Sequence, residues 1–265
     1  LDGTLYEDTR HFDYYARLIA NLLPEAQQRE FMDQYAAAIE DRHAVKIGRV
    51  YDAHRDLLLV QQAGEVLEAY QWDGTPLSED SITELYPEPI TLDLTDVVSI
   101  GDIWWIPPVI GRHMGIPSAK SYEMFEQTRK WMMGPDFAMQ PIPGLADALA
   151  RLSRKKKLVL LTNSPRGDSE AILGKLGLAE VFDHKIFMGM KPVRSQDHFR
   201  ELAKRYDCSF AEMISVGDNW VNDIDPPREL GCKTIFIDHH GQGDADRADV
   251  VVRSMEEAVD IFRKM

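Results

Sequence analysis

The chain has 265 residues, of which 44% are hydrophobic and 28% are charged, so it is long enough for one large domain or two modest ones. Thirty Lys and Arg residues against 44 Asp and Glu residues give a formal net charge of −14. This charge disfavours nucleic acid and anionic membrane surfaces as partners. No apolar run of about 18 residues occurs, so we expect no membrane partner and a soluble, cytoplasmic protein. Its cysteines, Cys208 and Cys232, are expected to be reduced.

Residues 11–140 form a block with a strong helical pattern at both ends. The stretches 12–23, 25–44 and 119–133 place apolar residues three and four apart, which predicts helices. Between them, 56–62 and 65–72 are typical of a β-hairpin, and repeated prolines from 72 to 117 predict loops with brief elements. We expect a mainly helical domain here.

From residue 141 onward, short apolar runs alternate with amphipathic stretches, as in an α/β domain built on a parallel sheet. The predicted strands are 157–161, 184–188, 212–216, 233–237 and 249–252. The predicted helices are 144–152, 169–176, 195–206 and 254–263, with Ser195 and Ser254 as expected N-caps.

Four segments place polar groups at or near the ends of apolar runs, where open α/β sheets bind their ligands. They are 1–6 with Asp2, 158–164 with Thr162 and Asn163, Lys191-Pro192, and 214–223 with Asp218 and Asp223. Taken singly, each is a weak signal, because Thr-Asn and Gly-Asp after a strand are usually turns and Lys-Pro is usually surface. Their order is informative, because it supplies an acid, a phosphate-oxygen donor, a cation and ligands for a hard metal ion.

In this order the segments resemble the motifs of the haloacid dehalogenase superfamily of phosphohydrolases. Leu1 to Leu5 match its first motif, Asp-x-Asp-Gly-Thr-Leu, after the first Asp, and Gly217 to Asp223 match its fourth, Gly-Asp-x-x-x-x-Asp. The strand ending at Thr162 and the pair Lys191-Pro192 are similar to the second and third motifs. The resemblance covers 1–6 and 141–265. It implies an α/β fold with a doubly wound, Rossmann-like parallel-sheet core made of 1–10 and 141–265, and a mainly helical cap domain inserted at 11–140.

The resemblance also implies a role for each matching residue. Asp2 would protonate the leaving group and then activate water, and its backbone carbonyl would face a Mg²⁺ ion. Asp218 would bind Mg²⁺ directly and Asp223 would support it. Thr162 and the backbone N–H of Asn163 would hold the phosphoryl oxygens, and Lys191 would neutralise charge. The metal set is therefore Asp2, Asp218 and Asp223.

The nucleophile of the family is an Asp two positions before Asp2, which places it ahead of Leu1. In the family the strand before this Asp lies in the middle of the sheet, and its loss would leave backbone groups unpaired. We therefore expect apolar residues ending in Asp to precede Leu1. A polypeptide that truly began at Leu1 would be unstable and inactive.

The resulting prediction is a Mg²⁺-dependent phosphatase that hydrolyses a small phosphorylated metabolite through an aspartyl-phosphate. Phosphoglycolate, nucleoside monophosphates and sugar phosphates are the substrates that the resemblance implies. A phosphomutase shares all four motifs and stays open, as does a non-catalytic binding protein if the nucleophile is absent. Asp2 argues against a dehalogenase, whose leaving group needs no proton. The run of Asp and His residues from 238 to 249 lacks a recognised ligand spacing, so we interpret it as a surface loop.

Overall fold

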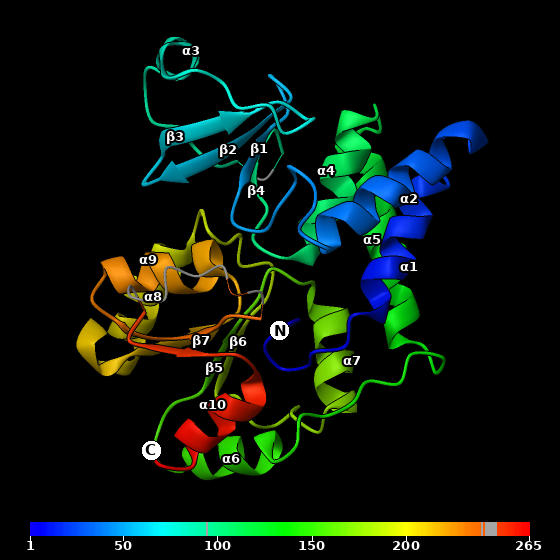
Figure 1. Cartoon of the computed structure of the whole chain (residues 1–265). Coiled ribbons are helices and arrows are strands. Elements are labelled where there is room, and N and C mark those ends of the chain that lie inside the picture. The colour runs from blue at the N-terminus through cyan, green and yellow to red at the C-terminus, as the bar shows by residue number, and fades with distance from the viewer. Residues whose placement is uncertain (94, 240, 242–247) are drawn as a thin grey trace. The chain divides into compact units, whose positions relative to one another are not determined.

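The computed structural model describes residues 1–93, 95–239, 241 and 248–265 (Figure 1). The chain divides into two compact units. The first unit contains Leu1–Asp8 and Arg129–Met265, and the second contains Thr9–Thr128. Among the described residues, no helix is both long and apolar enough to cross a bilayer.

The first unit holds parallel strands at the five places that the sequence predicts. Strand β5 (Val159–Leu161) pairs with β6 (His184–Ile186), and β7 (Ile214–Gly217), β8 (Lys233–Ile237) and β9 (Val250–Val252) form a second sheet in that order. The predicted α/β fold with parallel strands is therefore confirmed, and in the described residues these strands form two separate sheets. The physical reason is that β5 and β7 each pair on one side only, so their backbone groups do not join the two sheets.

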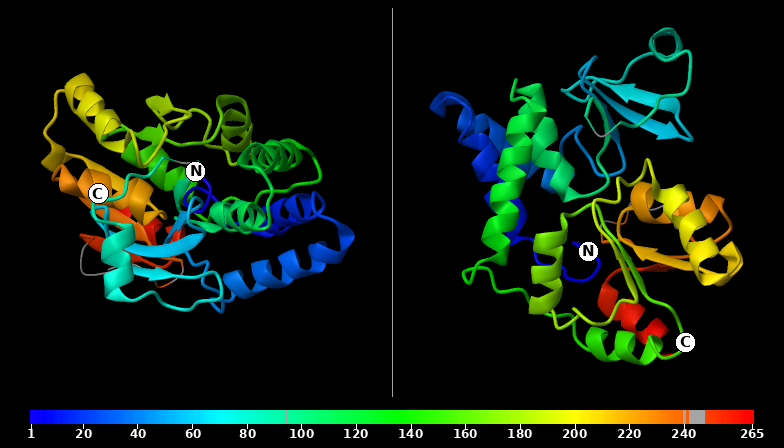
Figure 2. Two further views of the ribbon diagram at one scale, coloured as in Figure 1. Left: turned by 90° about the horizontal axis from the view of Figure 1, so that it is seen from above. Right: turned by 180° about the vertical axis from the view of Figure 1, so that it is seen from behind.

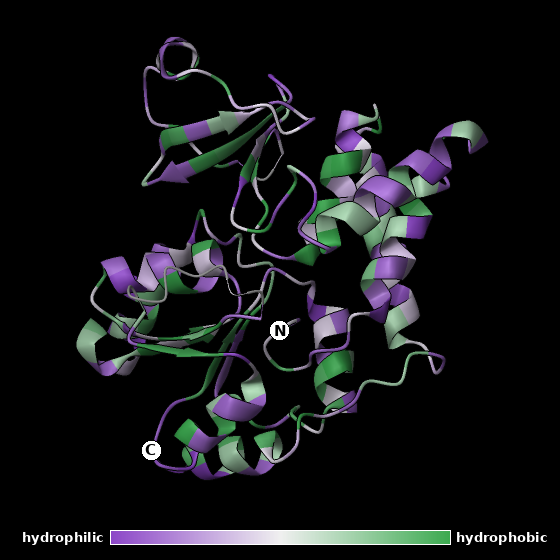
Figure 3. Cartoon of the chain, in the orientation of Figure 1, coloured by the Kyte–Doolittle hydropathy of each residue, from purple (hydrophilic) through white to green (hydrophobic). Residues whose placement is uncertain are grey.

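Helices cover both faces of the three-stranded sheet, which is the arrangement that buries parallel strands. Figures 1 and 2 show α8 (Ser195–Tyr206) and α9 (Asp225–Glu229) on one side, with α6 (Leu145–Leu152) and α10 (Met255–Phe262) on the other. Hydrophobic colour runs along most of β8 in Figure 3, as expected for a strand covered on both faces. Helix α7 (Arg166–Lys175) follows β5.

The two predicted N-caps behave differently. Ser254 caps α10 by accepting a hydrogen bond from the backbone N–H of Glu257, as predicted. Ser195 is instead the first helical residue of α8, after the cap residue Arg194. Its Oγ donates to the backbone oxygen of Asn222, 3.0 Å away, so this hydroxyl ties α8 to the loop after β7.

The second unit combines a helical layer with a small sheet. Its helices are α1 (Arg10–Ala20), α2 (Glu25–Ile39), α3 (Glu79–Leu85), the 3-10 turn η1 (Ile103–Trp105), α4 (Ile106–His113) and the start of α5 (Ser118–Met133). An antiparallel sheet has the order β3-β2-β1-β4, made of β1 (Val50–Asp52), β2 (Leu57–Gln62), β3 (Glu65–Tyr70) and β4 (Val97–Ser99).

The predicted hairpin is present, because β2 and β3 pair across Ala63 and Gly64, both in left-handed conformations. The expectation of a mainly helical block omitted the rest of this sheet. Strands β1 and β4 are three residues long and lie far apart in sequence, so no local periodicity indicates their pairing.

Candidate active site

The first segment, Leu1 to Tyr6, is a tight turn that lies against the end of β7. The N–H of Leu5 donates to the backbone oxygen of Leu1 at 2.8 Å, and Gly3 has a φ of 71°. The hydroxyl of Thr4 donates to Oδ1 of Asp218 at 2.5 Å. A Cβ on Gly3 would lie 2.2 Å from Oδ2 of Asp218. Only glycine permits this close approach.

The loop after β7 folds back over the end of its own strand. A Cβ on Gly217 would lie 2.4 Å from Cβ of Asp223, so a side chain there would push Asp223 away. The N–H of Asp223 donates to the backbone oxygen of Asn219 at 2.8 Å, and the Asn219 side chain accepts from the N–H of Asn222 at 3.1 Å. The hydroxyl of Ser215 donates to the backbone oxygen of Asp223 at 2.6 Å. The position of Asp223 is therefore fixed by its backbone.

The end of β5 is joined to the Lys191 segment by a reciprocal pair of hydrogen bonds. The Asn163 side chain donates to the backbone oxygen of Lys191 at 2.9 Å and accepts from its N–H at 2.7 Å. The hydroxyl of Thr162 is buried and accepts from the N–H of Ser164 at 3.1 Å. Nζ of Lys191 forms an ion pair with Asp223. These contacts connect the polar ends of β5 and β7 through one lysine.

Asp2 lies in a group of polar side chains that the sequence did not reveal as partners. Its Oδ1 accepts from the hydroxyl of Tyr6 and from Nη1 of Arg129, which is 2.6 Å away. Its Oδ2 accepts from Oγ of Ser164 at 3.4 Å. Nε of Arg129 also donates to Oδ2 of Asp168 at 2.5 Å. Tyr6 and Ser164 lie next to motif residues, so their proximity could have been foreseen, but nothing in the sequence marks Arg129 or Asp168.

Burial and neighbouring charges shift the pKa of two of these groups. Burial raises the pKa of Asp218, and repulsion from the nearby Asp223 carboxylate raises it further. Burial alone would lower the pKa of the Arg129 guanidinium, but Asp2 and Asp168 outweigh it and the net shift is upward. Arg129 is therefore a permanent buried cation.

The described residues contain no group of three or more His, Cys, Asp or Glu side chains arranged to hold a metal ion. Asp218 lies against Thr4, and Asp223 lies against Lys191. Two partly buried, mutually repelling carboxylates are nevertheless a donor set that a hard divalent cation would neutralise. Of the polar run from 238 to 249, His240, Asp244 and Asp246 lie outside the described residues.

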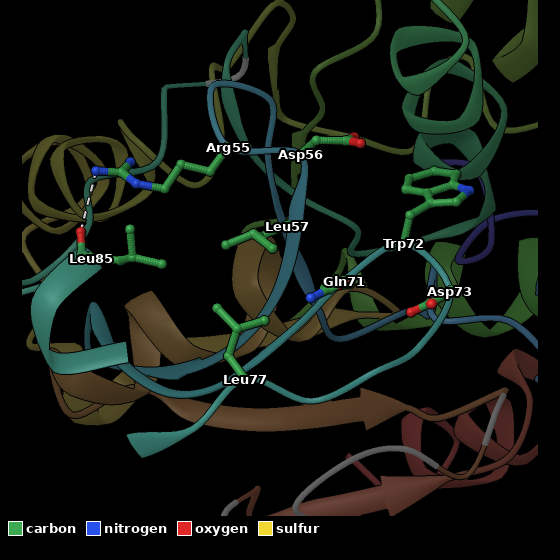
Figure 4. Close-up of a pocket in the computed structure, with 8 residues that line it drawn as sticks. All are labelled: Arg55, Asp56, Leu57, Gln71, Trp72, Asp73, Leu77 and Leu85. Carbon is green, nitrogen blue, oxygen red and sulfur yellow. Dashed lines mark hydrogen bonds between the residues drawn. The ribbon is translucent and has the colours of Figure 1, made fainter. Parts of the chain in front are cut away.

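The second unit has an open pocket of its own, with a volume of about 710 Å³ (Figure 4). None of the residues singled out by motif line it. The pocket is lined by Arg55, Asp56, Leu57, Gln71, Trp72, Asp73, Leu77 and Leu85. In Figure 4 Arg55 extends to the backbone oxygen of Leu85, 3.2 Å away. The indole of Trp72 stacks on His113 with ring centroids 3.7 Å apart.

Comparison with known proteins finds similarity to haloacid dehalogenase-like hydrolases. The model of the haloacid dehalogenase-like hydrolase family matches residues 134–231. Over these residues the chain is similar to the haloacid dehalogenase-like hydrolases. The matched range includes four of the predicted site residues, which are Thr162, Lys191, Asp218 and Asp223.

A solved structure with a TM-score above 0.5 supports the fold. The candidate HAD-hydrolase YfnB from Bacillus subtilis, bound to magnesium, is 14% identical, with 99% of this chain and 95% of that one aligned and a TM-score of 0.51. A HAD phosphatase from Thermococcus onnurineus is 19% identical over 57% of this chain and 83% of that one, with a TM-score of 0.40. A predicted phosphoglycolate phosphatase from Haemophilus somnus is 15% identical over 59% and 76%, with a TM-score of 0.48. No curated protein matches the chain.

Proposed function

We propose that this haloacid dehalogenase-like hydrolase is a Mg²⁺-dependent phosphatase that acts on a small phosphorylated metabolite. The observation that carries the proposal is the contact network joining four distant segments of the first unit. Thr4 contacts Asp218, Lys191 contacts both Asn163 and Asp223, and Ser164 contacts Asp2. A hydrolase fold alone would not license this reaction, but an acid, a cation and two further carboxylates gathered in one network support it.

Asp2 is the acid–base residue in this proposal. Its carboxyl group would protonate the leaving alcohol and then accept a proton from the attacking water. Both oxygens of Asp2 already accept hydrogen bonds, so its orientation is restricted before a substrate binds. The resemblance implies that the nucleophile is an aspartate two positions before Asp2, and the aspartyl-phosphate would form on its carboxylate.

Thr162 and Lys191 bind the phosphoryl group in this proposal. The Thr162 hydroxyl accepts one hydrogen bond from Ser164 and keeps its own proton for a phosphoryl oxygen. The N–H of Asn163 would supply a second donor. The ammonium of Lys191 is nine-tenths buried, so its charge acts in a medium of low dielectric constant and offsets negative charge effectively.

Asp218 and Asp223, with the backbone carbonyl of Asp2, would hold Mg²⁺ through oxygen ligands. When bound, the ion supplies Lewis-acid stabilisation of a phosphoryl oxygen. The raised pKa of Asp218 supports this assignment. A divalent cation would offset the cost of burying the Asp218 charge and the repulsion from Asp223, which together cause the shift. Only oxygen donors are involved, as a hard cation requires.

The second unit, Thr9–Thr128, would serve as the cap of this enzyme. It is an insertion between the first two motif segments in the chain, where caps of this superfamily supply substrate contacts. This unit combines helices with an antiparallel sheet, and this composition selects no single substrate. The proposed substrate class is therefore small phosphate monoesters, including phosphoglycolate, nucleoside monophosphates and sugar phosphates.

The test is a panel of phosphate monoesters incubated with the full-length protein in Mg²⁺ and in EDTA, with products followed by ³¹P NMR. Release of inorganic phosphate that requires Mg²⁺ is the expected result. Transfer of phosphate to a second hydroxyl would identify a phosphomutase instead. Binding without turnover of any ester would contradict the proposal and favour a non-catalytic binding protein.

A further inference from the structure

A buried guanidinium bridges two carboxylates in the first unit. Nη1 of Arg129 lies 2.6 Å from Oδ1 of Asp2, and Nε of Arg129 lies 2.5 Å from Oδ2 of Asp168. The three residues come from distant parts of the sequence. Asp2 belongs to the first motif segment, Arg129 to α5 and Asp168 to the first turn of α7.

The charges are shielded from water, so the bridge is sensitive to its geometry and to the loss of either partner. The side chains of Arg129 and Asp168 are 3% and 5% exposed, and that of Asp2 is 14% exposed. Removing one partner from such a buried pair leaves an uncompensated charge. The planar guanidinium directs Nε and Nη1 at fixed angles to different carboxylates, which a lysine ammonium cannot reproduce.

Asp168 is the fixed end of this bridge. Its Oδ1 accepts from the N–H of Ser169 at 3.0 Å, and its place in the first turn of α7 favours a negative charge. Helix α7 begins directly after the segment that contains Thr162. Asp168 therefore connects the position of Arg129 to the helix that follows the segment assigned to phosphate binding.

We propose that Arg129, oriented by Asp168, is a positioning residue that sets the direction of the Asp2 carboxyl group. This inference rests on the proposed function, in which Asp2 transfers protons. Asp2 has two oxygens and can rotate about its side-chain bonds. By fixing Oδ1, the guanidinium leaves Oδ2, which also accepts from Ser164, as the oxygen aimed at the end of β5. A misplacement of about 1 Å can cost on the order of 100-fold in rate.

The kinetic test is a double-mutant cycle of Arg129→Met and Asp2→Asn in the full-length protein. Arg129→Met is expected to lower kcat by about 10- to 100-fold with KM changed by less than about threefold. Arg129→Lys keeps the charge and should recover little of this loss, and Asp168→Asn should cause a smaller loss of the same kind. In the double variant the loss should be no greater than in Asp2→Asn alone, because Arg129 acts through Asp2. Arg228→Met is the matched control, since Arg228 pairs with Asp225 at 2.8 Å in the same unit.

If Arg129 had only a structural role, Arg129→Met would lower kcat only in proportion to the folded fraction. The losses in kcat from Arg129→Met and Asp2→Asn would then multiply in the double variant. That result would overturn the inference. Arg129→Lys and Asp168→Asn keep the test valid if Arg129→Met does not fold.

A crystal structure of Arg129→Lys provides a readout that does not need turnover. The Asp2 side chain should turn away from its position in the wild type, and an unmoved Asp2 would overturn the inference. If Asp2 turns but the wild type releases no phosphate from any ester, the positioning contact stands and the proposed function fails. If the wild type is active and Asp2 does not turn, the function stands and the inference fails.

Discussion

The hydroxyl oxygen of Thr4 lies 2.5 Å from Oδ1 of Asp218, although 214 positions separate the two residues in the sequence. This hydrogen bond holds the first motif segment against the end of β7. It also stabilises the ionised form of a carboxylate whose burial works in the opposite direction.

Gly3→Ala should abolish the close contact between the first segment and Asp218. The new Cβ would lie 2.2 Å from Oδ2 of Asp218, and it would occupy a residue with a φ of 71°. Gly177→Ala is a matched control, since Gly177 has the same φ and no neighbour within 4 Å. Left-handed strain costs about 1–2 kcal/mol for either alanine. Gly3→Ala, which adds the steric clash, should therefore lose at least as much stability as Gly177→Ala in urea unfolding, and only Gly3→Ala should lose nearly all phosphatase activity. Equal activities would contradict the steric argument.

Asp218→Asn should remove the response of the protein to Mg²⁺. Ligands that bind only the folded state raise its stability as their concentration increases. The wild type should therefore melt at a higher temperature in Mg²⁺ than in EDTA, and Asp218→Asn should melt at the same temperature in both. The control is Asp260→Asn, because Asp260 is an exposed residue of the same unit that pairs with Arg263. A Mg²⁺-dependent shift retained in Asp218→Asn would exclude this carboxylate as a ligand.

Asp2→Asn should impair turnover most for substrates with poor leaving groups. An alkyl alcohol must be protonated as it departs, whereas p-nitrophenolate departs unprotonated more easily. The loss in kcat should be about 100-fold or more for an alkyl phosphate and clearly smaller for p-nitrophenyl phosphate. Equal losses on the two substrates would count against Asp2 as the general acid.

Cys232 should be unreactive towards thiol reagents at neutral pH. Burial raises the pKa of its thiol to about 11, with a smaller contribution from Cys208, and only the thiolate is nucleophilic. In a Cys208→Ser variant, Ellman's reagent should label no thiol in the folded protein at about pH 8 and one thiol in denaturant. Labelling should begin only as the pH rises towards 11. Rapid labelling of the folded variant at the lower pH would show that Cys232 is not buried as described.

The sequence predicted elements where chemistry or periodicity is local. The five parallel strands, the hairpin joined at Ala63 and Gly64, and the N-cap at Ser254 all depend on residues within a few positions of one another. The order of the motif segments was sufficient to indicate the superfamily, because each segment has its own residue pattern.

The parts that could not be predicted depend on contacts between distant residues. Arg129 lies within an amphipathic helix, where an arginine is ordinarily a solvated surface residue, and only the folded chain shows that it is buried between Asp2 and Asp168. Ser195 resembles a helix cap in sequence but donates to Asn222 instead. Strands β1 and β4 are too short to show a period, and their pairing is set by the tertiary fold.

The most direct measurement is phosphate release from an alkyl phosphate by the full-length protein, compared in parallel with its Asp218→Asn variant over a range of Mg²⁺ concentrations. A phosphatase of the proposed type should release phosphate in proportion to Mg²⁺ occupancy, and the variant should release almost none while staying folded. No release by the wild type, or equal release by the two proteins, would contradict the proposed Mg²⁺-dependent phosphatase.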